Sequence, residues 1–284
     1  MLEIKHHLMI LEMCLEQKFM TLKQITKMFF SESPNEFDWP MKCVRKLVNA
    51  GLLRGVRPHF SSQVLYVVTL RGAALLKKHN LSSGLRAIKE IDERNFEHDG
   101  WVTDVRIIFE KLLGFTNWIP ERVLKKKNVR RKVPDGIATY DDHEHVIEVE
   151  RTLKNKRAYE KIFLNTCITD YPNADILYIV ANETDKTWLM KQAEGWQNIY
   201  FTTMNELLQM NWGVRFKSKG LVFKFERQEQ GGVHFNIPEE EVTDENDAFF
   251  EECREADREC ERMDAEYKKQ RVQALSNEEN HESK

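Results

Sequence analysis

The chain has 284 residues, 41% of them hydrophobic and 31% charged. This length suits two domains, or one domain with appendages, and the hydrophobic fraction is sufficient for buried cores. The net charge of -3 hides a division: residues 238–284 hold 17 acidic and 7 basic residues, net -10, which leaves +7 for residues 1–237. A positive surplus on the folded part is what binding to phosphate groups requires.

Two further features limit the class of protein. No run of 18 or more apolar residues exists, and the first 18 residues carry charges among their apolar positions, unlike a signal peptide. We therefore expect a cytoplasmic protein without membrane insertion. The five cysteines form an odd count without a CxxC pair, so neither a disulfide framework nor a zinc ribbon is indicated.

The N-terminal part predicts three helices and a hairpin. Apolar residues recur at helical spacing over residues 3–17 and again over residues 22–29, after Thr21. A third helix over residues 41–49 has an apolar face and a basic face, and Ala50-Gly51 ends it. Residues 52–58 and 63–70 are two β-rich runs that predict a hairpin, and another helix starts near Thr69.

The segment "LVNAGLLRGV…LYVVTLRGAALL" resembles the third helix and wing of a winged helix-turn-helix. The resemblance implies that the third helix enters the DNA major groove while the wing touches the neighbouring backbone. The residues that would contact DNA are Lys42, Arg45, Lys46, Arg54, Arg57 and His59. The alternative is a protein-interaction module on which these charges are only solvated.

The central part predicts a mixed sheet. An amphipathic helix over residues 99–113 is followed by strands around WIPERVL, VPDGIATY and HVIEVERT, the last two joined at Asp141-Asp142. A helix from about Lys154 to Tyr171, the apolar run ILYIVAN, a helix near Thr187 and the strand IYFTT come next. This order, α-β-β-β-α-β, predicts a sheet with helices on its faces.

Three carboxylates lie on the predicted strands. Because side chains alternate along a strand, Glu148 and Glu150 share one face with Val146, whereas the residues between them point to the other face. Asp135 stands on the preceding strand, behind a proline that removes a ladder donor. We expect the three carboxylates to converge, and oxygen ligands of this kind suit Mg²⁺ or Mn²⁺. The alternative is a solvated acidic strand face.

Pro134-Asp135 and Glu148-Val149-Glu150 on such a hairpin resemble the PD-(D/E)xK nuclease superfamily, except that Glu150 stands where the commoner pattern has lysine. The resemblance implies that the lysine can be replaced by glutamate or supplied by the next helix. The candidates are Lys154, Lys156 and Lys161, of which we favour Lys161 because it lies further into the helix. Degenerate members of the superfamily keep the fold without the chemistry.

A narrower resemblance joins these motifs. A winged helix, His98-Asp99, Trp118-x-Pro-Glu121, Pro134-Asp135-Gly136, Glu148-x-Glu150 and Tyr159-x-Lys161 look like the replication-relaxation family and the related MobC-type plasmid mobilisation relaxases, over residues 2–211. Such relaxases are inferred to nick one strand at an origin of transfer. The resemblance assigns catalysis to Asp135, Glu148, Glu150 and Lys161, the metal to the three acids, and supporting positions to His98, Asp99, Glu121, Lys154, Lys156 and Tyr159.

Other polar residues are expected to contact the DNA backbone, face solvent or pack rather than to act in catalysis. A basic run precedes the proposed metal ligand and would contact the DNA backbone: Lys125, Lys126, Lys127, Arg130, Arg131 and Lys132. His143 and His145 lie in the hairpin turn and are expected to face solvent. Tyr159 is expected to pack or to contact phosphate rather than to act as a covalent nucleophile.

The chain from Pro238 onward, here called the acidic tail, has few apolar positions and is expected to be a partly disordered or helical appendage. It could bind a coupling or accessory protein of conjugation, form a dimer contact, or cover the basic site as a DNA mimic.

These patterns predict an α+β protein: a winged-helix domain (residues 1–90), a restriction-endonuclease-like domain (91–237) and the tail (238–284). The predicted function is that of a metal-dependent nickase acting on double-stranded and nicked or single-stranded DNA, with a homodimer as an open option. The alternatives are a non-enzymatic DNA-binding regulator of plasmid replication or transfer, and a restriction or defence endonuclease.

Overall fold

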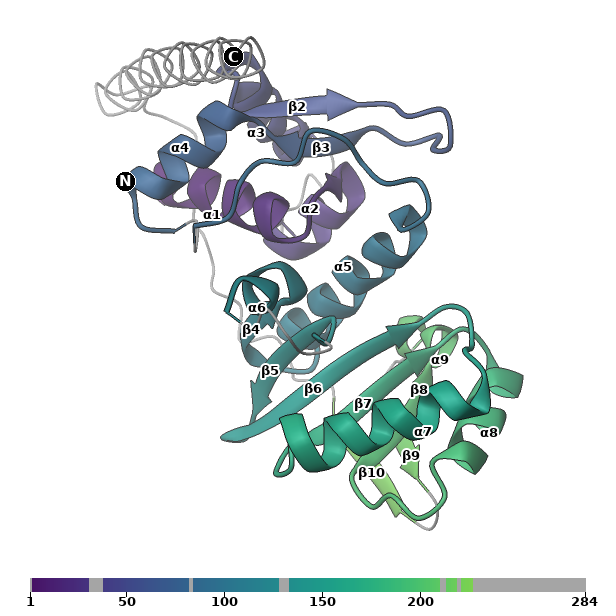
Figure 1. The fold of residues 1–284 in the computed structure, drawn as a ribbon. Helices are drawn as coiled ribbons and strands as arrows, with labels where there is room; N and C mark the ends of the chain where they lie inside the picture. The colour runs from purple at the N-terminus through teal and green to yellow at the C-terminus, as the bar shows by residue number, and fades with distance from the viewer. Residues whose placement is uncertain are drawn as a thin grey trace, which may run out of the picture.

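The computed structural model describes residues 2–30, 38–81, 84–127, 133–209, 213–218 and 221–226. The described chain contains a three-stranded and a seven-stranded sheet with helices around both (Figure 1). It is thus a mixed α+β protein, as predicted. The acidic tail lies outside the described residues.

Residues 2–81 form a helical unit around a small sheet, here called the N-terminal unit. Its sheet has the order β1-β3-β2, and all its pairs are antiparallel. The helices enclose one apolar core, which includes Ile10, Leu11, Ile25, Leu47, Leu52 and Leu75. The elements are α1 (Leu2–Glu16), β1 (Met20–Thr21), α2 (Leu22–Phe29), α3 (Asp38–Asn49), β2 (Leu53–Val56), β3 (Leu65–Val68) and α4 (Leu70–Lys78).

Local signals explain where these helices begin and end. Thr21 and Gln24 form a capping box at the start of α2, since each side chain bonds the other's backbone N–H. Thr69 accepts the N–H of Gly72 at the start of α4. Gly51, with φ of +70°, follows the end of α3, because glycine adopts this left-handed conformation without strain. The predicted order of helices and hairpin is confirmed, whereas the short β1 was not anticipated.

The larger sheet has the strand order β10-β9-β8-β7-β6-β5-β4. Strands β6, β7 and β8 are parallel, and the pairs outside them are antiparallel, so the predicted mixed sheet is confirmed. The strands are β4 (Thr116–Pro120), β5 (Gly136–Tyr140), β6 (His143–Glu150), β7 (Asp175–Val180), β8 (Ile199–Thr203), β9 (Gly213–Ser218) and β10 (Leu221–Glu226). Strands β9 and β10 were not predicted from the sequence.

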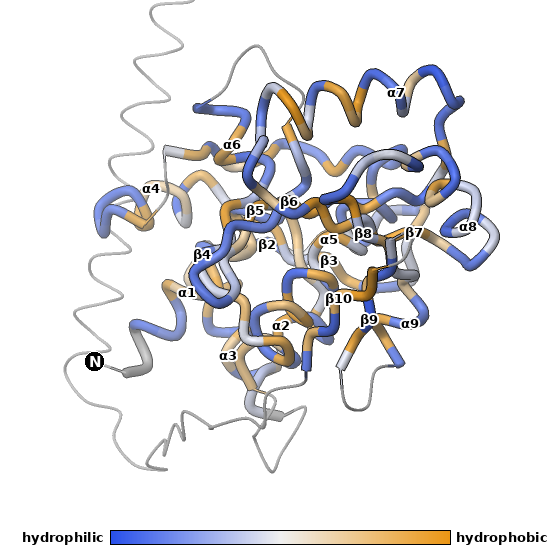
Figure 2. The backbone as a smooth tube through the Cα atoms, turned by 90° about the horizontal axis from the view of Figure 1, so that it is seen from below, coloured by the Kyte–Doolittle hydropathy of each residue, from blue (hydrophilic) through white to orange (hydrophobic). Residues whose placement is uncertain are grey.

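Helices cover both faces of this sheet, and Figure 2 shows hydrophobic stretches both on its strands and on the helices around it. One face packs against α5 (Phe96–Lys111) and α9 (Met204–Leu208), through residues such as Ile147 and Val149. The other face packs against α7 (Lys156–Leu164), the π-helix η1 (Asn165–Asp170) and α8 (Glu183–Gln192). A further short helix, α6 (Glu121–Lys127), follows β4, where the sequence predicts only a basic stretch.

Two tight features shape the hairpin of β5 and β6. Asp141 and Asp142 form its turn with φ of +50° and +57°, a left-handed conformation that aspartate tolerates better than most residues. At the other end of β5, Gly136 lies under the indole of Trp118, where an added Cβ would come within 2.4 Å of the ring. The glycine is therefore required by the close approach of this ring.

Helix α5 lies between the N-terminal unit and the larger sheet (Figure 1). Gln24 of α2 donates to the Gly100 carbonyl and to Asp104, both at 3.1 Å. Arg106 of α5 is buried and contacts Glu16 of α1 at 2.7 Å. Polar and charged contacts thus join the two parts of the chain. None of the helices in the described ranges is long and apolar enough to cross a membrane.

Candidate active site

Asp135 completes the pairing of β5 with β6 through its side chain. The ladder between the two strands ends at Gly136 and Ile147. Beyond this pair, Oδ2 of Asp135 accepts the backbone N–H of Val149 at 2.7 Å. The carbonyl of Asp135 accepts the N–H of Glu121, the first residue of α6, at 3.1 Å, so the residue is held from both sides. The carboxylate is buried and its orientation is fixed by the sheet.

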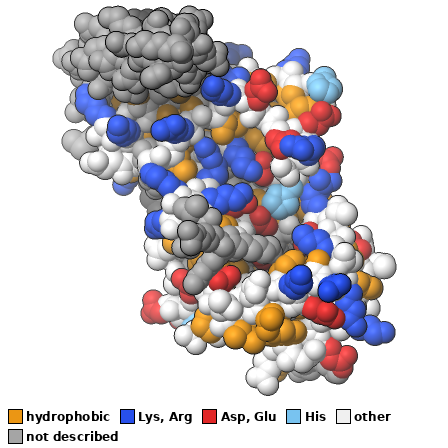
Figure 3. All heavy atoms as spheres, viewed as in Figure 1, with side chains coloured by type: hydrophobic (Ala, Val, Ile, Leu, Met, Phe, Trp, Pro, Cys, Tyr) orange, Lys and Arg blue, Asp and Glu red, His pale blue; other side chains and the backbone are white. Residues whose placement is uncertain are grey.

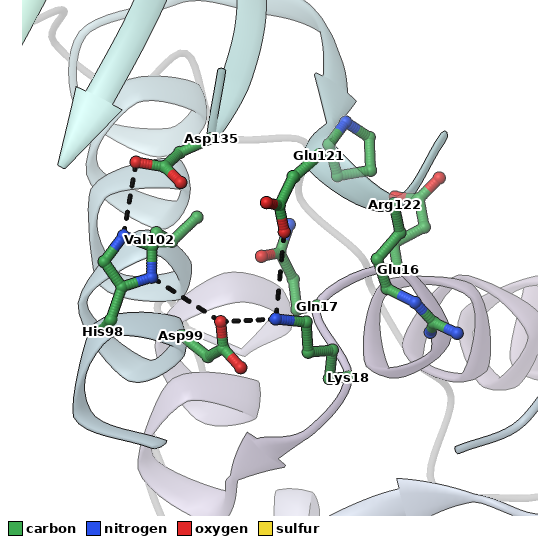
Figure 4. Close-up of a pocket in the computed structure, with 10 residues that line it drawn as sticks. Glu16, Gln17, Lys18, His98, Asp99, Val102, Glu121, Arg122 and Asp135 are labelled. Atoms are coloured by element: carbon green, nitrogen blue, oxygen red, sulfur yellow. Dashed lines mark hydrogen bonds and ion pairs between the residues drawn. The ribbon is translucent and has the colours of Figure 1, made fainter. Parts of the chain in front are cut away.

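His98, in the first turn of α5, places a positive charge against this carboxylate (Figure 4). Its Nε2 lies 3.4 Å from Oδ2 of Asp135 and 3.0 Å from the Val149 carbonyl, and its Nδ1 lies 3.6 Å from Asp99. Burial alone would lower the pKa of His98, but the hydrogen bonds with Asp135 and Asp99 raise it to about 10. His98 is therefore an imidazolium ion at neutral pH.

The chain of charges continues into the N-terminal unit. Lys18 follows α1 with φ of +73°, and its Nζ lies 2.6 Å from Oδ1 of Asp99. The same nitrogen is 3.9 Å from Glu121, the residue that donates its N–H to Asp135. Figure 4 shows these side chains around a small pocket that is open to solvent. Asp135 is thus connected to the N-terminal unit through His98, Asp99 and Lys18.

Glu148 and Glu150 lie on the face of β6 that α7 covers. Their neighbour on that face, Val146, packs in the core below α7, while Ile147 and Val149 pack against α5, so the predicted alternation is confirmed. The Glu148 side chain is buried. Glu150 accepts from Nζ of Lys154 at 2.6 Å, and this lysine also lies 5.8 Å from the ring centroid of Tyr159.

Lys161 lies on the outer side of α7. Tyr159 and Phe163 form the buried face of α7, and Lys161 follows Tyr159 by two residues, about 200° around the helix. Lys161 is accordingly exposed, and Lys154 is the lysine at Glu150. Tyr159 is buried, its hydroxyl oxygen accepts the Lys154 N–H at 3.2 Å, and burial raises its pKa, which agrees with a packing role.

The three acids differ in their immediate partners. Their oxygen donors have the chemistry that Mg²⁺ or Mn²⁺ prefers. Within the described residues, however, no group of three or more Asp, Glu, His or Cys side chains is placed to hold a metal ion. Asp135 is engaged by His98 and Val149, and Glu150 by Lys154. Cations of the chain itself therefore face two of the three proposed ligands.

The residues predicted to contact DNA are distributed over two surfaces. Lys42, Arg45 and Lys46 are exposed on α3, and Arg57 and His59 are exposed in the β2–β3 connection. Arg54 is half-buried and donates to the Lys89 carbonyl. Lys125, Lys126 and Lys127 are exposed on α6, whereas Arg130, Arg131 and Lys132 lie outside the described residues.

The two histidines of the hairpin differ. His143 is exposed as expected, but His145 is buried among rings that include Phe115, Tyr140 and Phe225. Burial and the nearby His143 lower the pKa of His145 to about 4, so it is neutral. The prediction that His145 faces solvent is wrong, because β6 begins at His143 and turns His145 toward the aromatic core.

Two residues at this junction were missed from the sequence. Lys18 contacts Asp99, 81 positions away, and Arg122 donates to the carbonyls of Leu15 and Arg86. Their partners are far away in the chain, so no local pattern marks them. Lys156, a predicted supporting residue, is exposed at the first position of α7.

Comparison with protein families relates this geometry to a known group. Residues 11–163 match the family model described as replication-relaxation. The chain belongs to the replication-relaxation family. The match runs from α1 to α7 and contains Asp135, Glu148 and Glu150. The family points to a role in plasmid replication or mobilisation and to interaction with DNA. A search among curated proteins found no significant match.

Proposed function

We propose that this family member is a relaxase that nicks DNA at the origin of transfer of a plasmid or integrative element. The observation that carries the proposal is the junction of β5 and β6, where Asp135 is fixed at the strand end beside Glu148 and Glu150 of the neighbouring strand. A buried carboxylate is costly unless cations meet it, so acids at these positions favour a functional role.

The N-terminal unit would supply the grip on DNA as a winged helix. Helix α3 buries Cys43, Val44 and Leu47 and leaves Lys42, Arg45 and Lys46 on its outer side. The exposed connection between β2 and β3 would be the wing that touches the DNA backbone. The lysines of α6 would extend this contact toward Asp135.

Within the second part, which would be a nuclease-like domain, Asp135, Glu148 and Glu150 would be the residues to hold a divalent ion. Bound Mg²⁺ or Mn²⁺ would supply Lewis-acid stabilisation of charge on the scissile phosphate. Lys154, which contacts Glu150, would neutralise phosphate charge there, and Lys156 and Lys161 would do so from the exposed side of α7.

A second candidate is a DNA-binding regulator of plasmid replication or transfer without chemistry. The observation that favours it is the occupation of two acids by the chain's own cations, His98 at Asp135 and Lys154 at Glu150. In this reading the charge network serves to hold the two parts of the molecule together.

The experiment is a nicking assay on supercoiled plasmid, with and without the cognate origin of transfer, in the presence of Mg²⁺ or Mn²⁺. We expect origin-dependent relaxation by the native protein and its loss in Asp135→Ala and Glu148→Ala. Glu144→Gln, which changes an exposed acid on the same strand, is the control and should nick normally. DNA binding without metal-dependent nicking by the native protein would favour the regulator.

A further inference from the structure

The outer side of α7 and η1 carries an unusual combination of side chains. Four residues follow one another along this side at intervals of three or four positions: Arg157, Lys161, Leu164 and Ile168. All four are exposed, and Leu164 and Ile168 have relative exposures of 50% and 59%. We call them the α7 stripe. Single exposed aliphatic residues are ordinary, but two adjacent ones beside two cations form a surface that another segment can cover.

The π-helix contributes to this surface. The N–H of Tyr171 bonds to the carbonyl of Thr166, five residues earlier, at 2.8 Å. Leu164 and Ile168 are four residues apart and stay on the same side where α7 continues into this π-helix. The inner side remains in the core through Phe163 and Cys167. Figure 3 shows hydrophobic side chains gathered on the face where α7 lies, with basic side chains beside them.

The chain itself contains a segment of complementary chemistry. In Asp247-Ala-Phe-Phe-Glu-Glu252, two aromatic residues are flanked by three acids, within a tail of net charge -10. Between Glu226, the last described residue, and Asp247 lie 20 residues, which can span up to roughly 65 to 70 Å when extended. The segment can therefore reach the α7 stripe from the end of β10.

We propose that residues 247–252 of the acidic tail dock on the α7 stripe and compete with DNA for it. Phe249 and Phe250 cover Leu164 and Ile168, while the flanking acids pair with Arg157 and Lys161. Because Lys154, just before α7, contacts Glu150, an acidic segment at this position also opposes the approach of phosphate to the candidate site. This consequence for DNA rests on the proposed function, whereas the docking does not.

The docking is tested on the full chain by placing a photo-crosslinking benzoylphenylalanine at position 249. The sample is a mixture of isotopically heavy and light chains, so that mass spectrometry of the cross-linked peptides separates links within one chain from links between two chains. We expect links within one chain to residues 157–168, reduced on the order of fivefold or more in the double variant Leu164→Ser/Ile168→Ser. Leu208→Ser is the matched control, because Leu208 is 52% exposed on α9, on the opposite face of the sheet.

Each outcome decides the proposal. Links that remain in the double variant, links to other surfaces, or links between heavy and light chains would overturn it, and the last result would assign the stripe to a second copy of the chain. A separate DNA-binding measurement tests whether the tail competes with DNA for the stripe. At low salt the double variant should bind DNA on the order of threefold more tightly than the native protein. The cross-link needs neither DNA nor nicking, so failure of the docking and failure of the relaxase proposal are distinguishable.

Discussion

The two ends of the candidate site are neutralised in different ways. Glu150 is paired with Lys154, four residues further along the same segment. Asp135 is paired with His98, which belongs to α5, and through Asp99 it is connected to Lys18 in the N-terminal unit. One carboxylate therefore depends on local sequence, and the other on the correct assembly of two distant parts of the chain. A substitution that disturbs the N-terminal unit should consequently weaken the pairing of Asp135 with its cation and leave the pairing of Glu150 unchanged.

The largest effect is expected from His98→Ala. The substitution leaves the buried Asp135 carboxylate without its cation, and breaking such a pair should lower the free energy of unfolding by about 2 to 3 kcal/mol, less than for a fully buried pair because His98 is partly exposed. Urea denaturation measures the change. His143→Ala, at an exposed histidine of the same sheet, is the control and should change little. Equal effects of the two substitutions would contradict a special role of His98.

Raising the pH should weaken the same connection without a mutation. The pKa of His98 is about 10 in the folded protein and near 6.5 when unperturbed, so its stabilising contribution is fully present below pH 6.5 and is lost as the pH rises toward 10. The difference in unfolding free energy between the native protein and His98→Gln should therefore shrink by about 2 kcal/mol between pH 6 and pH 10. A constant difference over this range would show that His98 is not charged.

Lys18→Met should have an intermediate effect and lower the free energy of unfolding by about 1 kcal/mol, because Lys18 is more exposed than its partner Asp99. The sharper measurement is a pair of double-mutant cycles. Lys18→Met and His98→Ala share a network and should be non-additive, whereas Lys18→Met and Lys154→Ala should add within about 0.5 kcal/mol. Additivity in both cycles would remove the distinction between the two ends of the site.

Lys154→Ala should have the smallest effect and change the free energy of unfolding by no more than about 0.5 kcal/mol. Its pair with Glu150 is local, and the lysine is almost half exposed. Thermal unfolding at low and high salt measures it. A loss above about 1.5 kcal/mol would mean that Glu150 relies on this lysine as strongly as Asp135 relies on His98.

Much of the fold was predictable because its signals are local. The period of apolar residues, the Thr21 and Thr69 caps and the Asp141-Asp142 turn lie within short stretches of sequence, and the predicted elements agree with the structure there. The shared face of Glu148 and Glu150 followed from strand alternation alone. Strands β9 and β10 and helix α6 were not anticipated, since their segments are short and rich in charge.

The site was less predictable because its partners are distant. Nothing near Lys18 indicates Asp99. The burial of His145 depends on Phe115, just before β4, and on rings of β5 and β10. The choice among three lysines also required the exact start of α7, since a shift of one residue turns a side chain by about 100°.

The contact between Gly136 and Trp118 has a consequence for tracing this family through evolution. Two pressures act on the triplet Pro134-Asp135-Gly136: a chemical one on the aspartate, and a steric one on the glycine, which has no room for a methyl group beneath the indole. The glycine is required as long as the tryptophan remains, whether or not the proposed DNA cleavage is present. If the proposed relaxase function is correct, the aspartate and the two glutamates, rather than the whole triplet, are the positions whose loss would mark an inactive lineage.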